Sequence, residues 1–418
     1  MSKLQSVRGT HDIYGEDALR HRQVIDTFYR VATTFGFSEL STPIFEFTEV
    51  FKRPLGEASD IVAKEMYCFE DRGGEALTLR PEFTAGVARS FISNGMQENL
   101  PCRFMSHGPV FRYERPQKGR YRQFHQLNAE CLGPNDPGTD VDLIVMGWTV
   151  MQALGIADKV VVNLNSLGDA ESRAAYRTAL ITYFSMHRAQ LSEDSVRRLE
   201  SNPLRILDSK DEGDKILVKD APILSDYLNA ESKAFFDAVT TGLDAAGVPY
   251  VHNERLVRGL DYYSHTAFEF ITDALGSQGT VLGGGRYDGL IHQLGGPITA
   301  AVGWAAGIER LAMMLENVDA PPRAIVMMPM GAEADAAAYS IANQLRSAGY
   351  TVVADRSGNL KKRLNRANKT NASHAIIIGD DEMEKAVVLV KNLDAGTQSE
   401  ITLSDYAALI ARVSHDNG

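Results

Sequence analysis

The feature that most constrains this chain is a basic hairpin between Pro109 and Glu130, with the sequence PVFRYERPQKGRYRQFHQLNAE. PVFRYE, before the loop, has apolar residues at alternate positions, and FHQLNAE comes after the loop. Each segment predicts a strand. The loop RPQKGRYR carries no acid and four cations, namely Arg115, Lys118, Arg120 and Arg122. Arg112 lies within the first strand, where its planar guanidinium requires an anionic partner and suits a phosphate. The pattern predicts a hairpin that binds a polyanion, with a plain solvated turn as the alternative.

Two later stretches extend the pattern: Leu256 to Phe270, LVRGLDYYSHTAFEF, and Leu282 to Leu290, LGGGRYDGL. Together with Phe111-Arg112-Tyr113-Glu114 and the basic loop, they resemble the histidyl-tRNA synthetase family of class II aminoacyl-tRNA synthetases over nearly the whole chain. The resemblance implies an α/β (α+β) protein whose catalytic domain is an antiparallel sheet flanked by helices. It also implies a ligase that activates L-histidine with ATP and Mg²⁺ and transfers it to tRNA(His). No protein ligand for the metal is assigned.

Size and composition indicate a globular protein of more than one domain. The chain has 418 residues, of which 44% are hydrophobic and 23% charged, and this length predicts two or three domains. No apolar run approaches a membrane span, and MSKLQSVRGTHD lacks the apolar region of a signal peptide. We therefore expect a cytoplasmic protein without a membrane partner. The three cysteines form no CxxC pair and no cluster at zinc spacing, which argues against disulfides and structural zinc.

The net charge of −11 does not exclude a nucleic-acid partner, because binding depends on local basic patches. Near the N-terminus, Leu19 to Phe35 has apolar residues at helical spacing and is followed by Gly36. FSELSTPIFEF then alternates like a strand, but Pro43 cannot donate to a ladder and predicts an edge. This helix and strand resemble the first class II motif, which implies a homodimer. An ordinary helix and edge strand in a monomer is the alternative.

A candidate amino-acid site follows a hairpin predicted around Arg72-Gly73-Gly74. After it, Pro81 fixes the backbone that presents Glu82 and Thr84, a carboxylate and a hydroxyl that could hold an ammonium group. The resemblance implies that they face the α-amino group of histidine, although the family usually has a small residue at the position of Phe83. From the residues alone, a surface turn explains them equally well.

Gln126, Asn128 and Glu130 alternate along the second strand of the basic hairpin. Since an unpaired buried polar group costs about 1 to 3 kcal/mol, these side chains need partners, which a bound polar ligand would supply. The resemblance assigns Gln126 and Glu130 to the histidine pocket, with Glu130 selecting one imidazole tautomer. A structural hydrogen-bond network inside the sheet is the alternative.

Arg258 follows an apolar pair and could project from a strand entrance towards a phosphate, although a lone arginine is more often in a salt bridge. The resemblance implies that Arg258 acts with Arg112 as a catalytic cation beside the α-phosphate of ATP. It also implies that Arg258, Tyr262 and Tyr263 border the bound histidine.

The stretch AAVGWAAGIERLAMML begins with small residues and continues as a predicted helix. It resembles the third class II motif. The resemblance implies that Arg310 stacks on adenine opposite Phe124 and holds the outer phosphates with Arg120. Glu114 belongs to the same expected ATP site. For AAVGWAAGIERLAMML, a tight helix–sheet contact would explain the glycines without a ligand but would leave Arg310 unexplained. LGGGRYDGL is neither a Walker loop nor GxGxxG.

Two further segments are expected to contact tRNA. Residues from about 170 to 248 have helical spacing and resemble the family's helical insertion within a catalytic domain of residues 1–320. Glu316 to Arg323, ENVDAPPR, is the predicted linker. The strand and helix pattern beyond it predicts a compact α/β domain over 321–418. The resemblance makes this an anticodon-binding domain whose basic helix contacts tRNA, together with Arg115, Lys118 and Arg122 of the hairpin; a solvated basic helix is the alternative. The cations of that helix are Lys361, Lys362, Arg363, Arg366 and Lys369.

Two other functions fit a related fold. One is a non-catalytic, histidine-sensing regulatory paralogue of the ATP phosphoribosyltransferase complex. Such proteins commonly lose the catalytic residues and the anticodon-binding domain, whereas this chain retains Arg112, Arg258, Arg310 and the basic terminal domain. The other is a biotin- or lipoate-type ligase, which would have no use for the segment from Arg258 to Tyr263.

Overall fold

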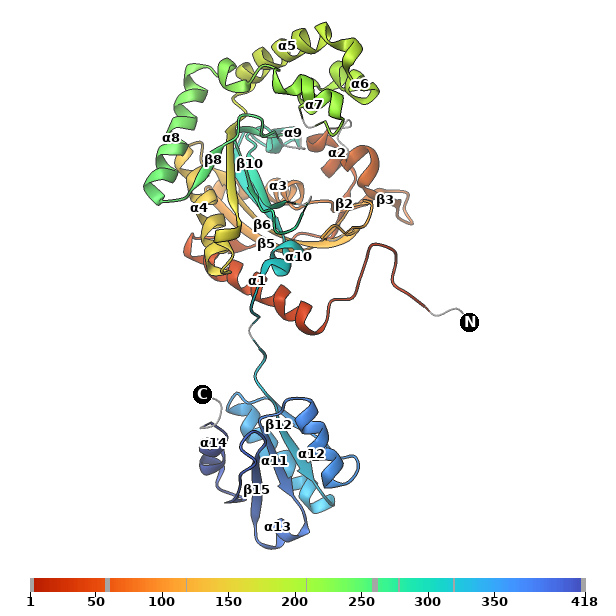
Figure 1. The fold of residues 1–418 in the computed structure, drawn as a ribbon, viewed down its shortest axis with the longest axis vertical. Coiled ribbons are helices and arrows are strands. Elements are labelled where there is room, and N and C mark those ends of the chain that lie inside the picture. Colours follow the sequence, from red (N-terminus) through yellow and green to blue (C-terminus); the bar gives the residue numbers. More distant parts are fainter. Residues whose placement is uncertain are drawn as a thin grey trace. The chain divides into compact units, whose positions relative to one another are not determined.

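The computed structural model describes residues 4–56, 61–117, 119–207, 209–257, 262–276, 279–318 and 320–414. The chain forms two compact units, a first unit from Met1 to Val318 and a second unit from Asp319 to Gly418 (Figure 1). None of the described helices is both long and apolar enough to cross a bilayer.

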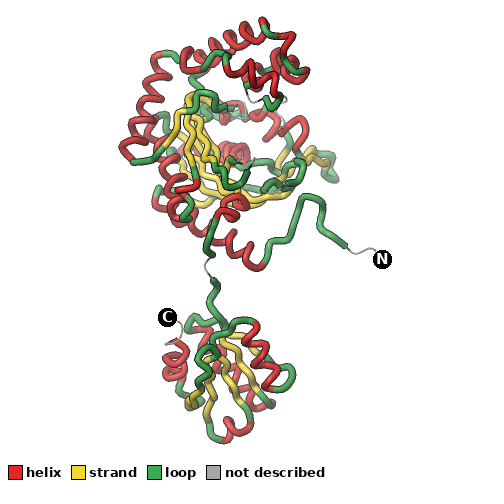
Figure 2. Tube along the Cα trace, in the orientation of Figure 1, coloured by secondary structure: helices red, strands yellow, loops and turns green. Residues whose placement is uncertain are grey.

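The first unit is built on an eight-stranded sheet with the order β1-β5-β6-β11-β10-β9-β7-β8. Figure 2 shows the strands of this unit in yellow with red helices around them. Its central strands pair antiparallel, as predicted, while β1 with β5 and β7 with β8 pair parallel at the two edges. The strands are β1 Ser38–Glu39, β5 Cys102–Phe111, β6 Gln123–Gly133, β7 Val161–Ser166, β8 Tyr250–His252, β9 Ser264–Ile271, β10 Thr280–Arg286 and β11 Ala300–Gly307.

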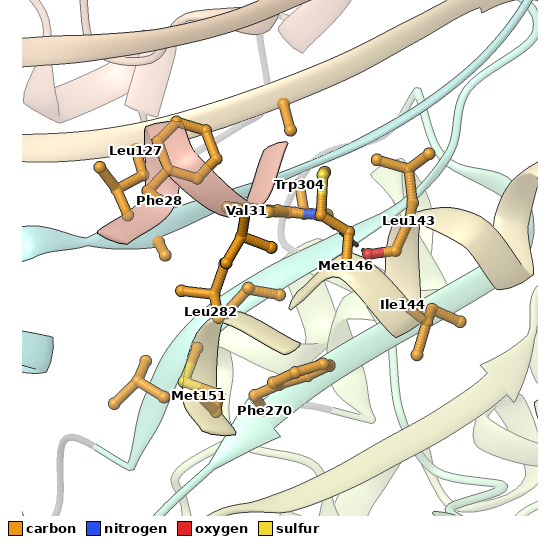
Figure 3. Packing of buried hydrophobic residues seen from close by; sticks show 14 of the residues in the cluster. Phe28, Val31, Leu127, Leu143, Ile144, Met146, Met151, Phe270, Leu282 and Trp304 are labelled. Carbon is orange, nitrogen blue, oxygen red and sulfur yellow. Dashed lines mark hydrogen bonds between the residues drawn. The ribbon is translucent and has the colours of Figure 1, made fainter. Parts of the chain in front are cut away.

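Four helices pack with the sheet into the main hydrophobic core: α1 Gly15–Thr34, α4 Pro137–Ala153, α8 Ala230–Ala246 and α10 Ile308–Met314. Figure 3 shows Phe28, Leu143 and Trp304 in this core. The indole Nε1 of Trp304 donates to the Leu143 carbonyl at 3.1 Å, so its polar atom is satisfied inside the core. Leu127 and Ala129 of β6 belong to this core. Because side chains alternate along a strand, the even-numbered residues of β6 face the opposite side.

A second core lies on that opposite side and includes Tyr262, Tyr263 and Tyr287. Three helices contribute to it: α2 Glu49–Leu55, α3 Thr84–Ser93 and α9 Leu290–Gln293. Beside it, β2 Phe45–Phe47, β3 Tyr67–Glu70 and β4 Ala76–Leu79 form a three-stranded sheet with the order β2-β4-β3. The expected hairpin around Arg72-Gly73-Gly74 is therefore present.

Two local predictions in this unit were wrong. FSELSTPIFEF is not one strand, because it divides around Pro43 into β1 and β2, which belong to different sheets. Arg112 does not lie inside a strand, since β5 ends at Phe111. Its backbone N–H nevertheless donates to the Arg122 carbonyl at 2.9 Å, which continues the hairpin by one step.

The expected helical insertion has a core of its own only in its first part. Helices α5 Ala170–Met186, α6 Glu193–Ser201 and α7 Glu212–Lys219 enclose a separate cluster that includes Tyr176, Leu180 and Phe184. In contrast, α8 places Val239 and Leu243 in the main core. The last helix of the predicted insertion thus supports the large sheet.

The second unit is a five-stranded sheet with the order β13-β12-β14-β15-β16 and four helices. These strands and helices agree with the α/β pattern predicted beyond the linker. The elements are β12 Ile325–Pro329, α11 Ala332–Ser347, β13 Val352–Ala354, α12 Leu360–Lys369, β14 His374–Ile378, α13 Asp380–Glu384, β15 Val387–Asn392, β16 Gln398–Thr402 and α14 Tyr406–Ser414.

Candidate active site

A cavity of about 700 Å³ in the first unit gathers most of the predicted site residues. Arg258 and Lys118 lie outside the described residues. The predicted residues that line the cavity are Glu82, Thr84, Arg112, Glu114, Arg120, Phe124, Gln126, Tyr262, Tyr263 and Arg310. Segments far apart in the sequence thus line one cavity, as expected if they form one active site.

Glu130 is fully buried beside this cavity and anchors a hydrogen-bond network. Its carboxylate accepts from Asn128 Nδ2 at 2.8 Å, from Thr84 Oγ1 at 2.5 Å and from the Tyr287 hydroxyl. Burial raises the pKa of Glu130 to about 7, although these three donors act in the opposite direction. The site therefore contains a carboxyl group that changes charge near neutral pH.

Tyr287 is a site residue to which sequence reasoning assigned no role. Its side chain is buried, and its ring centroid lies 5.6 Å from that of Tyr262. The available signal was its place in LGGGRYDGL, where a tyrosine directly follows the end of β10.

The glycines around Glu130 have identifiable structural reasons. Gly303 pairs with Glu130 in the register of β11 and β6, and a Cβ there would overlap Glu130 Oε2. In β10, a Cβ on Gly284 would overlap the Gly303 carbonyl, and one on Gly285 would crowd Tyr263. Close packing within the sheet, and in one case room for Glu130, explains these glycines.

Gln126 and Asn128 contribute two buried acceptors, since Gln126 Oε1 and Asn128 Oδ1 have no hydrogen-bond partner among the described residues. The Asn128 amide nitrogen already donates to Glu130 and, at 3.3 Å, to the Trp304 carbonyl. Of these two residues, Gln126 lines the cavity and Asn128 does not. Because an unpaired buried acceptor is costly, Gln126 Oε1 favours a ligand that brings an N–H donor.

Glu82 and Thr84 also have structural partners. The carboxylate of Glu82 accepts from the backbone N–H groups of Thr84 at 2.7 Å and Ala85 at 2.8 Å, which satisfies donors in the first turn of α3. Thr84 donates to Glu130. Both residues line the cavity, so the predicted ammonium site coincides with the start of a helix.

The expected ATP-binding residues are close to one another. The guanidinium of Arg112 lies 5.4 Å from the ring centroid of Phe124, and its Nε donates to the Pro81 carbonyl at 2.9 Å. Arg120 pairs with Glu114 at 2.6 Å. Arg310 Nε donates to the carbonyl of Gly119 at 3.2 Å. Since Gly119 belongs to the hairpin loop, Arg310 links that loop to α10.

The two described hairpin cations expected to bind tRNA, Arg115 and Arg122, differ in how accessible they are to an external partner. Arg115 is exposed. Arg122 is partly buried, with its guanidinium 3.9 Å from the Tyr113 ring centroid and its Nε donating to the Glu114 carbonyl at 3.3 Å. Arg122 therefore braces the loop, which leaves less of its guanidinium for an external partner.

The cations of the basic helix α12 also differ in accessibility. Lys361 and Lys362 are exposed, and Arg366 pairs with Asp355 at 2.7 Å. Arg363 is buried, and its guanidinium donates to four backbone carbonyls. The prediction that Arg363 contacts tRNA is not supported by this arrangement, because a buried and satisfied guanidinium holds the domain together.

Comparison with known proteins agrees with this geometry. The family model described as histidyl-tRNA synthetase matches residues 9–311, and the anticodon binding domain model matches residues 324–412. Histidine–tRNA ligase of Gluconacetobacter diazotrophicus is 56% identical over 98% of this chain and 99% of the relative. The enzyme of Rhodospirillum rubrum is 54% identical over 99% and 100%. Apo histidyl-tRNA synthetase of S. aureus superposes with a TM-score of 0.82 at 34% identity, covering 100% of both chains.

The fold and the two family matches define an aminoacyl-tRNA synthetase, a ligase that uses ATP to join an amino acid to tRNA. Within that class, the chain belongs to the histidyl-tRNA synthetase family. The family prediction is confirmed, and with it the main prediction of function over the regulatory alternative.

Proposed function

We propose that the cavity of the first unit carries out both steps of histidine transfer to tRNA(His), in the cytoplasm. In the first step, a carboxylate oxygen of histidine attacks the α-phosphorus of ATP and pyrophosphate leaves. In the second step, a hydroxyl of the terminal ribose of tRNA attacks the histidyl carbonyl carbon and AMP leaves. The observation that carries the proposal is one cavity lined both by the unpaired acceptor Gln126 Oε1 and by a cationic wall of Arg112, Arg120 and Arg310.

Histidine recognition is assigned to Gln126 and to the buried Glu130 beside the cavity. An imidazole supplies the N–H donor that Gln126 lacks in the described structure, and Glu130 attracts a protonated ring when it is ionised. Tyr262 and Tyr263 close the pocket as buried aromatic walls. Glu82 and Thr84 face the α-amino group. This arrangement holds the carboxylate of histidine towards the cations.

The cationic wall is assigned to ATP. The first step brings a carboxylate up to an anionic phosphate, so positioning and charge neutralisation lower the barrier. Arg112 and Arg258 stabilise the α-phosphate, while Arg120 and Arg310 hold the outer phosphates and Phe124 covers the adenine. Glu65, Glu114 and Glu269 line the cavity and supply the hard oxygen donors that Mg²⁺ prefers. When bound with ATP, Mg²⁺ supplies further neutralisation of phosphate charge.

Contacts to tRNA are assigned to both units, with a catalytic domain over 1–320 and an anticodon-binding domain over 321–418. Lys361 and Lys362 project from α12 as exposed cations, and Arg115 is exposed on the hairpin near the catalytic cavity. Cations of this kind attract phosphate groups and release counterions on binding.

A homodimer is supported by exposed aromatic residues on the small sheet. Phe45, Phe47 and Phe69 are 53%, 57% and 44% exposed. They come from β2 and β3, the two strands that flank β4 in this sheet. Clustered exposed aromatic residues favour a protein interface. Sedimentation of the variant Phe45→Asp/Phe47→Asp as a monomer, against a dimeric parent protein, would support this interface. A monomeric parent protein would refute the dimer.

The test of the proposed reaction is pyrophosphate exchange into ATP with each amino acid in turn. Exchange is expected with histidine alone. Exchange with another amino acid, or without any, would overturn the assignment of the pocket.

A further inference from the structure

Lys210 is a cation of the helical insertion that reaches the catalytic cavity. It lies on the turn between the short 3-10 helix Pro203–Ile206 and α7, and it lines the cavity together with Arg112, Arg120 and Arg310. Its side chain is exposed, and its ammonium group has no hydrogen bond or ion pair with any described residue. The main sheet and the insertion thus both contribute positive charge to one cavity.

The turn that carries Lys210 is anchored on its N-terminal side by a buried carboxylate. Asp214 is fully buried and accepts hydrogen bonds from three serine side chains and one backbone N–H. The hydroxyl donors are Ser192 at 2.7 Å, Ser195 at 2.6 Å and Ser209 at 2.6 Å, and the backbone donor is Ser192 N at 2.9 Å. Ser209 directly precedes Lys210, so this network fixes the backbone next to the lysine.

The same turn is anchored on its C-terminal side by the start of α7. Asp211 follows Lys210 and accepts from the backbone N–H groups of Gly213 at 2.8 Å and Asp214 at 3.1 Å as a helix N-cap. A lysine between two fixed neighbours keeps its Cα in place, which reduces the backbone entropy lost when its ammonium engages a ligand.

Other cations that line the cavity have protein partners. Arg120 pairs with Glu114, Arg310 donates to Gly119, and Arg255 donates to the carbonyls of Lys219, Ala221 and Pro222. An ordinary surface lysine would project into open solvent. Lys210 lines a cavity proposed to hold phosphate, and its ammonium has neither an ion pair nor a hydrogen bond to a described residue, which favours a contact with a ligand.

We propose that Lys210 binds a phosphate group of the substrate inside the cavity, so that the insertion contributes a contact to the reaction itself. The inference rests on the proposed function of the cavity. The phosphate belongs either to the triphosphate of ATP or to the last nucleotides of tRNA, and the chemistry of an ammonium with a phosphate oxygen is the same for both.

The experiment compares Lys210→Ala with Lys215→Ala in the full-length protein. Lys215 is a matched control on α7, where it is exposed to solvent, pairs with Glu212 at 2.7 Å and does not line the cavity. One arm measures histidine-dependent pyrophosphate exchange with ATP varied, without tRNA. The other measures single-turnover transfer from preformed enzyme-bound histidyl-adenylate to tRNA. We expect Lys210→Ala to lower the rate about tenfold in one of the two assays. This loss is smaller than the loss on removing an enclosed catalytic donor, because Lys210 is exposed.

Each result has a defined meaning. A loss in the ATP arm supports the proposal with triphosphate as the ligand, and a loss confined to transfer supports it with a tRNA phosphate. Lys210→Arg should retain part of the activity in the affected arm, because it keeps the charge. Unchanged rates in both arms, or equal losses in Lys215→Ala, would overturn the proposal. If the unmodified protein showed no histidine-dependent exchange, the proposed function itself would fail, whereas unchanged exchange together with unchanged transfer in Lys210→Ala would remove only the role of Lys210.

Discussion

Glu130→Gln is expected to make the first unit more stable at alkaline pH while removing histidine activation. Burial raises the pKa of Glu130 from 4.5 to about 7, so the folded state binds this proton more tightly than the unfolded chain does. The contribution of the protonated carboxyl is complete below about pH 4.5 and is lost as the pH rises to about 7. At 1.36 kcal/mol per pH unit, the loss amounts to roughly 3 kcal/mol above pH 7.

A glutamine resembles the protonated carboxyl group and does not ionise. The variant and the parent protein should therefore have similar unfolding free energies near pH 4.5, and the variant should gain up to roughly 3 kcal/mol between there and pH 8. Both tryptophans, Trp148 and Trp304, lie in the first unit. Tryptophan fluorescence in urea thus reports the unfolding of this unit without interference from the second.

The control is Glu200→Gln, which removes a carboxylate that is 70% exposed and pairs with Arg188 on the surface. It should not reproduce the gain in stability at pH 8 that is expected of Glu130→Gln. If Glu130→Gln lowered the stability at pH 8, the three donors around Glu130 would outweigh burial, and the raised pKa would be wrong. Retained pyrophosphate exchange in this variant would separate Glu130 from histidine recognition.

Three further changes test other parts of the structure. Gly303→Ala should displace the Glu130 carboxylate, because the added Cβ overlaps Oε2; the KM for histidine should rise by about tenfold or more with that for ATP nearly unchanged. Lys361→Ala/Lys362→Ala should raise the KM for tRNA and flatten its dependence on salt, without changing exchange. Arg363→Ala should instead lower the unfolding temperature of the second unit by calorimetry, because one buried and three partly buried carbonyls lose their donor. Equal behaviour of the lysine and arginine variants would contradict this division of roles.

Regular periodicity made much of the fold predictable. The hairpin of β5 and β6 follows from alternation and from a loop rich in cations, and α1 follows from apolar residues at helical spacing. Pro43 was only partly informative. Proline cannot donate a hydrogen bond to a β-ladder, but this does not show whether the strand continues past it at a sheet edge or ends there. The order of strands in the sheet depends on contacts between distant segments, which local patterns do not encode.

The candidate site was predictable as a set of residues more than as a set of contacts. Sequence spacing indicated that Gln126, Asn128 and Glu130 share one face of a strand, but not that Tyr287 donates to Glu130 from 157 positions away. The basic character of α12 was equally visible, yet only the packing shows that Arg363 turns inward. A guanidinium that satisfies backbone carbonyls and one that awaits a phosphate have the same sequence signal.

The residues of β6 and β11 around Glu130 are unusual for buried strands, which normally carry apolar side chains. A fully buried acid and two buried acceptors without described partners are unfavourable for folding. Gly303 adds to this cost, since glycine weakens a strand interior, but it leaves the space that the Glu130 carboxylate occupies. These unfavourable features all lie on β6 and its neighbour β11, whereas the opposite side of β6 contributes Leu127 and Ala129 to the main core. The core therefore holds the backbone of β6 in place while Gln126 presents an unpaired acceptor to the cavity, which is the arrangement that selective binding of an N–H donor requires.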